Sequence, residues 1–427
     1  MRIPFMLAVL LLTHYGAAHG QQPDTVLVLA PDRVFDGTAM HSGWRVWVQG
    51  GTILAAGENA GIPAGTPQKM IALPGTTLLP GLIEGHSHLL LHPYNETKWD
   101  EQVLNESSAE RVARAVVHAQ QTLLAGFTTV RDLGTEGSGY DDAGLKTAIE
   151  KGLIPGPRMI IATRGIVATG SYGPRLKNTE HSIIRGAAEA DGTDALIREV
   201  RTQIGNGADV VKVYADYRWG LEKNPEPTFS LEELKTVVGV ASAGGRKVVA
   251  HASTAEGMKR AALAGISTIE HGDNGNEEVF DIMLRNKTAY CPTLAAAEAT
   301  AGYDGWRKGI DADTKRISAK KKSFAVALQK GVTICFGGDV GVFPHGDNAR
   351  EMELMVEYGM KPIAVLQAAT AVNADVFGYG NRIGRIRKGL AADIIAVKGD
   401  PSQNIKDIRQ TRLVMKEGAV YLYRQTQ

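Results

Sequence analysis

The two ends of the chain share one pattern of hydrophobic positions. Short runs rich in Val, Leu and Ile are separated by turns that contain Gly, which is typical of β-strands. These runs lie at residues 26–29, 45–48, 52–56, 392–397, 411–415 and 419–423. We therefore predict that residues 21–80 and 385–427 form one small β-sandwich domain from both chain ends.

The middle of the chain alternates between strand-like and helix-like patterns. The strand-like runs begin near Leu78, Thr128, Arg158, Val210, Lys247, Thr268, Ala289 and Thr333. Helical periodicity covers residues 109–125, 257–263, 314–329 and 363–373. Ser230 and Glu233 form a capping-box pattern at the start of a further helix, which we expect to end at Gly244. Eight such units predict an α/β fold, a (β/α)8 TIM-like barrel over residues 81–384.

Two smaller features of this region lead to further expectations. We expect the run Lys320-Lys321-Lys322 to form a solvated helix face. Cys291 and Cys335 both lie in apolar, strand-like stretches, so buried free thiols and a disulfide bridge both stay open.

Composition changes this picture little. The chain has 427 residues, 44% of them hydrophobic, which suits a large barrel with an accessory domain. A net charge of +1 gives no indication of a nucleic-acid partner.

Arg2, the apolar run 5–12 and the small residues Ala18 and Gly20 predict a signal peptide over residues 1–20. We therefore expect an exported protein, periplasmic or secreted, without a membrane partner after cleavage.

Candidate metal ligands follow the predicted barrel strands. His86 and His88 come after the first strand, and residues two apart on an extended chain point the same way. His251 and His271 end two consecutive later strands. Because a barrel places its active site at these strand ends, the four imidazoles are expected to meet. A single strand-end histidine would more often be structural.

Lys212 and Asp339 extend this set. Lys212 lies in the β-branched run 210–213, where a buried ammonium is unfavourable. It is either an outward-facing or ion-paired lysine, or a neutral amine that has added carbon dioxide to form a metal-bridging carbamate. Asp339 follows a strand end with paired glycines, where it is either a ligand or a capping residue. Imidazoles and anionic oxygens suit zinc or another divalent first-row metal. Glu270 and Asp132 are candidates for supporting the ligands.

These motifs together resemble the amidohydrolase superfamily. The matching features are the stretch 79–88, which reads Leu-Pro-Gly-Leu-Ile-Glu-Gly-His-Ser-His, with Lys212, His251, 270–272, 338–339 and the tail 384–394. Within it the chain resembles the imidazolonepropionase-like and Xaa-Pro dipeptidase group, in particular bacterial amidohydrolases that hydrolyse ochratoxin A to ochratoxin alpha and phenylalanine.

The resemblance implies a binuclear site and a symmetric assembly. It implies that His86 and His88 bind one metal, that His251 and His271 bind the other, and that N6-carboxylated Lys212 bridges them. Asp339 would complete the site. A homo-oligomer, such as an octamer, is also implied. The stretch 169–173 departs from the pattern of many relatives, because Tyr172 stands where a substrate-binding histidine often lies.

We expect a metal-dependent hydrolase that cleaves an amide or dipeptide and releases a C-terminal apolar amino acid. Asp339 would take a proton from the attacking water and pass it to the leaving amine. The candidates for substrate contact are Tyr172, Tyr214, Tyr217, Arg218 and His345. A cyclic-amide hydrolase or deaminase is an alternative that Lys212 disfavours. A non-catalytic exported binding protein is a third reading, which the complete set of six ligand candidates disfavours.

Overall fold

The structure of the protein is a computed structural model. It describes residues 25–58, 66–174, 183–219 and 224–424. The predicted signal peptide, residues 1–20, lies outside the described residues. Among these residues, no helix combines the length and the apolar character that crossing a membrane requires.

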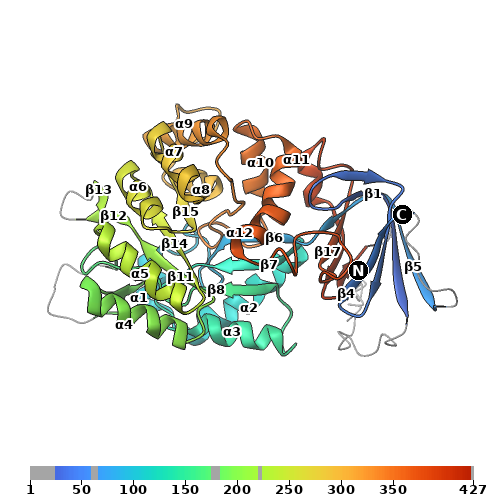
Figure 1. Ribbon diagram of the computed structural model, residues 1–427, viewed down its shortest axis with the longest axis horizontal. Coiled ribbons are helices and arrows are strands. Elements are labelled where there is room, and N and C mark those ends of the chain that lie inside the picture. The colour runs from blue at the N-terminus through green and yellow to red at the C-terminus, as the bar shows by residue number, and fades with distance from the viewer. Residues whose placement is uncertain (1–24, 59–65, 175–182, 220–223, 425–427) are drawn as a thin grey trace, which may run out of the picture.

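Strands from both ends of the chain form one mixed sheet, here called the end sheet (Figure 1). Its strands are β1 (Val26–Phe35), β2 (Met40–Ser42), β3 (Arg45–Gln49), β4 (Thr52–Gly57), β5 (Gln68–Pro80), β17 (Ile394–Lys398), β18 (Thr411–Lys416) and β19 (Ala419–Tyr423). Their order is β19-β18-β17-β5-β1-β3-β4, with β2 paired to β1. β5 connects the two ends, because it pairs parallel with β1 and antiparallel with β17.

The boundary between the end sheet and the next sheet falls at Gly81. The predicted first barrel strand near Leu78 is wrong in its boundary, because β5 carries Leu78 to Pro80 within the end sheet. The following strand begins only at Leu82. Gly81 packs so closely that a Cβ there would lie 2.1 Å from Oγ1 of Thr128. The run that looks continuous in sequence is therefore divided at a Pro-Gly step.

A second set of strands runs parallel through the middle of the chain. These are β6 (Leu82–Ser87), β7 (Phe127–Asp132), β8 (Arg158–Ile161), β9 (Ile166–Val167), β10 (Ala188–Glu189), β11 (Val210–Tyr214), β14 (Lys247–Ala252), β15 (Thr268–His271) and β16 (Ala289–Cys291). An antiparallel hairpin, β12 (Asp216–Trp219) and β13 (Asn224–Pro227), follows β11. The hydrogen-bonded neighbours are β6-β7-β8 and β10-β9-β11-β14-β15-β16. A backbone hydrogen bond of 2.8 Å from Asp209 to Ile161 links β8 to the start of β11.

The eighth predicted strand, near Thr333, is not a regular strand. It makes only isolated parallel bridges, from Ile334 to Tyr290 and from Val340 to Ser87. Gly337 packs closely within this segment, because a Cβ there would lie 2.5 Å from Sγ of Cys291. Backbone hydrogen bonds still connect the segment to both neighbouring strands, from Tyr290 of β16 to Thr333 (2.9 Å) and from Gly85 of β6 to Phe336 (3.1 Å).

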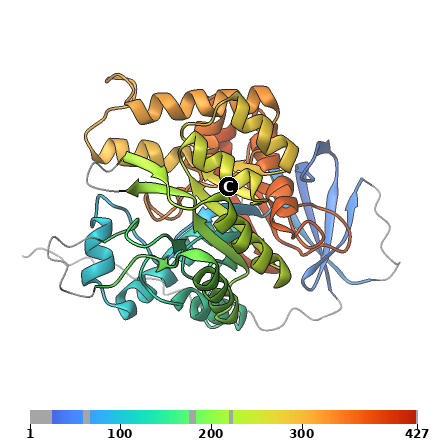
Figure 2. The same cartoon turned by 60° about the vertical axis from the view of Figure 1, so that its left-hand side comes forward.

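Helices surround the parallel strands (Figure 2). They are α1 (Trp99–Asn105), α2 (Ser108–Leu124), α3 (Asp141–Glu150), α4 (Gly192–Gly205), α5 (Leu231–Ala243), α6 (Ala255–Leu263), α7 (Glu277–Asn286), α8 (Leu294–Tyr303), α9 (Lys315–Lys330), α10 (Ala349–Glu357), α11 (Pro362–Gln367) and α12 (Asn373–Phe377), with a π-helical turn at Ala368–Val372 and a 3-10 turn at Ile405–Arg409. The capping box of Ser230 and Glu233 is confirmed at the start of α5, which ends before Gly244. The predicted helix over 363–373 is interrupted by the π-helical turn.

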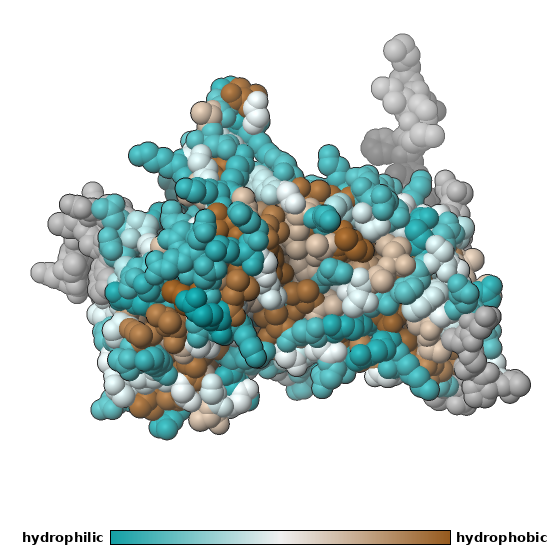
Figure 3. Space-filling model, turned by 45° about the horizontal axis from the view of Figure 1, so that its top comes forward, coloured by the Kyte–Doolittle hydropathy of each residue, from teal (hydrophilic) through white to brown (hydrophobic). Residues whose placement is uncertain are grey.

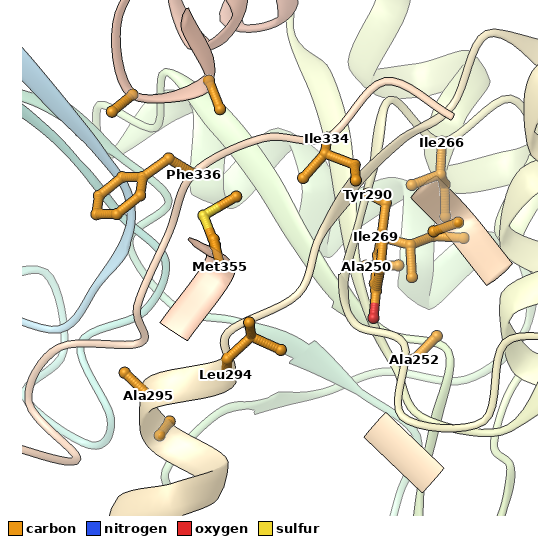
Figure 4. Close-up of a cluster of buried hydrophobic side chains, with 14 of the residues drawn as sticks. Ala250, Ala252, Ile266, Ile269, Tyr290, Leu294, Ala295, Ile334, Phe336 and Met355 are labelled. Atoms are coloured by element: carbon orange, nitrogen blue, oxygen red, sulfur yellow. The ribbon is translucent and has the colours of Figure 1, made fainter. Parts of the chain in front are cut away.

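The main core lies between the parallel strands and these helices. Figure 4 shows Ile269, Tyr290 and Ile334 packed side by side, with Phe336 beside Met355 of α10. Cys291 and Cys335 lie in a smaller buried cluster as free thiols, which decides between the two alternatives left open.

The expectation of a solvated Lys320-Lys321-Lys322 face is wrong for its first member. Lys320 is buried against Asp273, whereas Lys322 is exposed. The turn of α9 carries Lys320 inward and its neighbour outward, because adjacent residues of a helix face different directions. Elsewhere the surface mixes both kinds of residue, and Figure 3 shows hydrophobic residues gathered between hydrophilic ones on one face.

Candidate metal centre

The predicted ligands meet in one cleft at the ends of the parallel strands. His86 lies at the end of β6, Lys212 in β11, His251 in β14 and His271 at the end of β15. The cleft has a volume of about 1320 Å³, and all six ligand candidates line it: His86, His88, Lys212, His251, His271 and Asp339. Strands far apart in sequence thus bring one set of donors together.

Three of these side chains already form a ligand group. Nε2 of His86 lies 3.5 Å from Oδ1 of Asp339, and Nε2 of His88 lies 3.4 Å from the same oxygen. One donor atom from each of the three residues lies within 4.8 Å of the others. Two imidazole nitrogens and a carboxylate oxygen converging in this way fit a divalent metal ion.

Hydrogen bonds hold the imidazoles in orientations that leave Nε2 facing the cleft. Nδ1 of His86 lies 3.0 Å from Oε2 of Glu270, and Nδ1 of His88 lies 2.9 Å from the carbonyl oxygen of Gly134. Nδ1 of His271 lies 2.8 Å from Oγ1 of Thr293. Such contacts fix the tautomer of a metal-binding histidine, and Glu270 is therefore placed as the sequence predicted.

The remaining two histidines lie side by side. The ring centroids of His251 and His271 are 4.5 Å apart, and those of His86 and His271 are 5.1 Å apart. Nε2 of His251 is 3.7 Å from Oδ1 of Asp216, which is too long for a hydrogen bond. Asp216 instead accepts from the backbone nitrogens of Ser253 and Thr254 and so fixes the chain directly after His251.

Lys212 lines the same cleft and is buried. Its side chain is 1% exposed, and its Nζ lies 5.3 Å from the centre of the Tyr214 ring. Among the described residues, no hydrogen bond or ion pair to Nζ is found. Burial lowers the pKa of Lys212, although the charges of Glu270 and Asp339 oppose this effect. The amine is therefore held in surroundings that disfavour its charged form.

Electrostatics divide the ligands into neutral and charged groups. Burial lowers the pKa of His251 to about 3 and that of His86 to about 4. Burial acts in the same direction on His88, but the hydrogen bond and charge of Asp339 outweigh it and raise this pKa to about 9. Burial would raise the pKa of Asp339, yet His86 and His88 hold it well below its usual range. Asp339 is therefore anionic, His86 and His251 are neutral, and His88 would release its proton on binding a divalent ion.

Backbone strain is concentrated around the same site. Asp339 has a φ of 65° and His271 a φ of 74°, while Thr293, which orients His271, has a φ of 48°. Each such conformation is unfavourable by roughly 1–3 kcal/mol for a residue other than Gly. The fold therefore holds these side chains at positions that local preference alone would not select.

A buried carboxylate that sequence reasoning missed connects the two halves of the ligand group. Oε1 of Glu84 accepts hydrogen bonds from the backbone nitrogens of His86 and Gly338, and Oε2 accepts one from Asn348. Burial raises the pKa of Glu84 to about 7. The signal available in the sequence was a glutamate within an otherwise apolar strand, two residues before His86.

Asp132 supports the backbone and not a ligand side chain. Its Oδ2 accepts a hydrogen bond of 2.7 Å from the backbone nitrogen of Leu89 and so fixes the turn after His88. Burial raises the pKa of Asp132 to about 6, although the charge of His88 lowers it.

Four of the five predicted substrate contacts line the cleft. They are Tyr172, Tyr214, Tyr217 and Arg218. His345 is not among the residues that line it. It is buried beneath the turn after His88, where Nε2 lies 3.0 Å from the carbonyl oxygen of Leu91 and the ring stacks on His118. The loop after Asp339 folds back into the protein, which sequence position alone does not reveal. Glu136 and Trp99 line the cleft as well and were not predicted.

The chain belongs to the amidohydrolase family, whose sequence profile matches residues 77–420. It is a hydrolytic enzyme that acts on carbon–nitrogen bonds. The resemblance drawn from the motifs is thereby confirmed. Members of this family generally use divalent metal ions, which agrees with the ligand group formed by His86, His88 and Asp339.

Individual relatives are similar along most of the chain. An ochratoxinase from Aspergillus niger is 31% identical over 362 residues, which cover 79% of this chain and 73% of the relative. The structure of a Xaa-Pro dipeptidase with methionine bound in its active site matches with a TM-score of 0.81 at 29% identity, covering 93% of this chain and 100% of the other. The structure of the A. niger ochratoxinase matches with a TM-score of 0.80 at 25% identity, covering 93% and 96%.

Proposed function

We propose that the protein is a binuclear-metal hydrolase that cleaves an amide bond and releases a C-terminal apolar amino acid. The observation that carries this proposal is the position of Lys212, buried without a polar partner among the described residues and lining the same cleft as the four histidines. A neutral amine in this place can add carbon dioxide, and the resulting carbamate would supply two anionic oxygens to neighbouring cations. A purely structural lysine would be expected to have an ion-pair partner.

The residues divide into two ligand pairs around this lysine. His86 and His88 would hold one ion, His251 and His271 the other, and carboxylated Lys212 would bridge them. Zinc fits this donor set of imidazoles and carboxylates. When bound, two such ions acidify a water molecule and polarise the scissile carbonyl.

The protein's own groups then move the proton and orient the ligands. The Asp339 carboxylate accepts the proton of the attacking water and delivers it to the nitrogen of the leaving amine. Glu270, the carbonyl of Gly134 and Thr293 keep the imidazoles of His86, His88 and His271 in place. Glu84 keeps the strand end of His86 in register with the segment before Asp339.

Other residues that line the cleft suit the carboxylate and the side chain of the released amino acid. Arg218 and Arg316 line the cleft, as do the small apolar residues Ala296, Ala297 and Ala301. A guanidinium group binds a carboxylate through paired hydrogen bonds, and an apolar wall accepts an apolar side chain. The names of the relatives, an ochratoxinase and a Xaa-Pro dipeptidase, agree with such a product.

We also propose that the parallel strands close into a (β/α)8 barrel. Support comes from hydrogen bonds that connect each strand to the next, including those from Asp209 to Ile161 and from Gly85 to Phe336. The end sheet, packed beside it, would correspond to the predicted sandwich.

A combined metal and substrate assay tests the function. The purified enzyme should contain about two divalent ions per chain by elemental analysis. It should release a free amino acid from at least one class within a panel of N-acyl amino acids, Xaa-Pro dipeptides, ochratoxin A and cyclic amides. Opening of a cyclic amide without release of an amino acid from any other compound would indicate the cyclic-amide alternative. An active protein free of metal would contradict the mechanism.

A further inference from the structure

A buried carboxylate stands in the cleft beside the metal ligands and takes no part in the mechanism above. Glu136 follows β7, is 4% exposed and has a φ of 48°. Its backbone is fixed by Arg111, whose guanidinium donates to the carbonyl oxygens of Glu136 (2.7 Å) and Thr135 (3.0 Å). A positive φ is unfavourable for a residue other than Gly, and here it places an acidic side chain in the cleft. A carboxylate buried there loses solvation, so it needs compensating partners.

Neutral aromatic donors surround this carboxylate. Oε2 accepts hydrogen bonds from Nε1 of Trp99 (3.0 Å) and from the hydroxyl of Tyr172 (2.8 Å), and Oε1 accepts one from the hydroxyl of Tyr214 (3.2 Å). An indole N–H can only donate, so the carboxylate acts as an acceptor on that side. Among the described residues, no Lys, Arg or His forms an ion pair with Glu136. The direct hydrogen-bond partners of the carboxylate are therefore neutral groups, although the charges of Arg111 and His88 lie close enough to interact with it.

The aromatic rings form a cage next to the carboxylate. The ring of Tyr172 lies 5.3 Å from that of Trp99 and 4.8 Å from those of Tyr214 and Tyr217, and all four line the cleft. Aromatic faces attract a cation, and a carboxylate adds a charge-assisted hydrogen bond. A cage of this composition suits an ammonium group and disfavours a second anion.

The cage lies close to the candidate metal ligands, where the ammonium group of an α-aminoacyl substrate would lie. Oε1 of Glu136 lies 3.2 Å, and Cε1 of His88 3.6 Å, from the point that a Cβ on Gly134 would occupy. The carboxylate and the metal ligand are thus close neighbours. In an α-aminoacyl group the ammonium nitrogen is only two bonds from the carbonyl carbon that is attacked, so its binding partner must lie close to the ligands.

We propose that Glu136 and its aromatic cage bind the free α-ammonium group of the substrate's N-terminal residue. This inference rests on the proposed function and narrows it to unblocked dipeptides, in preference to N-acyl amino acids. Glu136 would act as a specificity residue, because it distinguishes a cationic acyl portion from a neutral one. Arg218 and Arg316, which line the same cleft, are candidates to bind the other charged end of the same dipeptide.

Two substrates that differ only in the ammonium group test this proposal. Ala-Phe and N-propionyl-Phe have the same scissile bond and leaving group, and the second carries hydrogen where the first carries the ammonium. The metal-loaded wild-type enzyme should hydrolyse Ala-Phe with a kcat/KM about 10- to 100-fold higher, the range of one charge-assisted contact. In Glu136→Gln, kcat/KM for Ala-Phe should fall by about the same factor, while that for N-propionyl-Phe changes by less than about threefold.

A second variant separates the charge from the architecture of the cage. Trp99→Phe keeps a ring and the charge of Glu136 but removes one donor, so the preference for Ala-Phe should persist. An equal loss on both substrates in Glu136→Gln would show that Glu136 only supports the fold. A wild-type enzyme that prefers N-propionyl-Phe would overturn the proposal without any variant.

Failure of the proposed function gives a different result. If the metal-loaded enzyme hydrolyses neither compound, the proposed peptidase function is wrong. Calorimetric binding of the two compounds then decides the role of Glu136 by itself. Tighter binding of Ala-Phe that disappears in Glu136→Gln supports the ammonium site, and equal binding of both compounds refutes it.

Discussion

Two buried lysines of this protein have the same exposure and opposite surroundings. Lys212 and Lys320 are each 1% exposed. Nζ of Lys320 lies 2.7 Å from Oδ1 of Asp273 and donates to the carbonyl oxygens of His271 and Pro292. Among the described residues Nζ of Lys212 has no hydrogen bond or ion pair, and the centre of the Tyr214 ring lies 5.3 Å away. Burial alone therefore does not distinguish a structural lysine from a functional one.

The difference lies in how the cost of burial is balanced. An ammonium group taken from water loses several kcal/mol of solvation, which an ion pair and hydrogen bonds can offset. Lys320 has both. Lys212 has neither among the described residues, so its surroundings favour a neutral amine or a chemically modified one. Lys320 thus stabilises the packing of α9, whereas Lys212, as we propose, is carboxylated and bridges two metal ions.

The largest expected effect comes from removing Lys212. Lys212→Ala should lower kcat/KM by about 10³-fold or more, because the bridging anion contributes several kcal/mol to holding the metal site. Hydrolysis of the best substrate of the panel, together with metal content, checks this. Turnover like that of the wild type would refute the carbamate.

Carbon dioxide itself provides the complementary test. The wild-type enzyme, stripped of metal by a chelator in carbon-dioxide-free buffer, should regain activity faster when zinc is added together with bicarbonate than with zinc alone. Lys212→Ala should show no such difference. Equal recovery of the wild type under both conditions would speak against a carboxylated lysine.

The second-largest effect is expected on stability. Here the loss of Lys320, and not that of Lys212, should have the larger effect on the free energy of unfolding. Lys320→Met should lower the free energy of unfolding by about 3 kcal/mol, because it leaves Asp273 buried with Arg316 as its remaining partner. Lys212→Met should change it by less than about 1 kcal/mol, because no ion pair is lost. Both are measured by urea unfolding of metal-free proteins. A larger loss for Lys212→Met would mean that Lys212 is structural.

The sequence predicts the ligands better than their supports. His86, His88, His251 and His271 are recognisable because each lies at or near a strand end, and the fold brings strand ends together. Lys212 is recognisable as a lysine within a β-branched strand, and Asp339 by the paired glycines before it. The sequence also locates the end of β6, but it places the start of this strand near Leu78 instead of at Leu82.

The residues that support the ligand candidates are not recognisable from local sequence, because their contacts join segments that are far apart in the chain. Glu84 binds Asn348, 264 residues further along the chain, and Glu136 binds Trp99 and two tyrosines. Lys320 looked like part of a charged surface run, because helix rotation alone does not show which member faces Asp273. His345 seemed to belong to the cleft because of its loop, but its imidazole turns inward to Leu91.

A smaller effect is expected from the other partner of Asp273. Nε of Arg316 lies 2.7 Å from Oδ2 of Asp273, but its side chain is 41% exposed. Arg316→Gln should therefore lower the free energy of unfolding by about 1 kcal/mol, since Lys320 still neutralises the carboxylate. The same urea experiment measures it. A loss as large as that of Lys320→Met would show that the two cations are equally important to Asp273.

The smallest effect should come from the neighbour of Lys320 in the same run. Lys321 lies 2.7 Å from Asp313, with side chains 38% and 32% exposed, so water screens this pair. Lys321→Ala should change the free energy of unfolding by about 0.5 kcal/mol or less, and raising the salt concentration should reduce even this difference. Lys320→Met and Lys321→Ala form a matched pair, adjacent in sequence and on the same helix. If their effects on urea unfolding were equal, burial and pairing would not explain the stability of this helix, and the contrast between Lys212 and Lys320 would lose its physical basis.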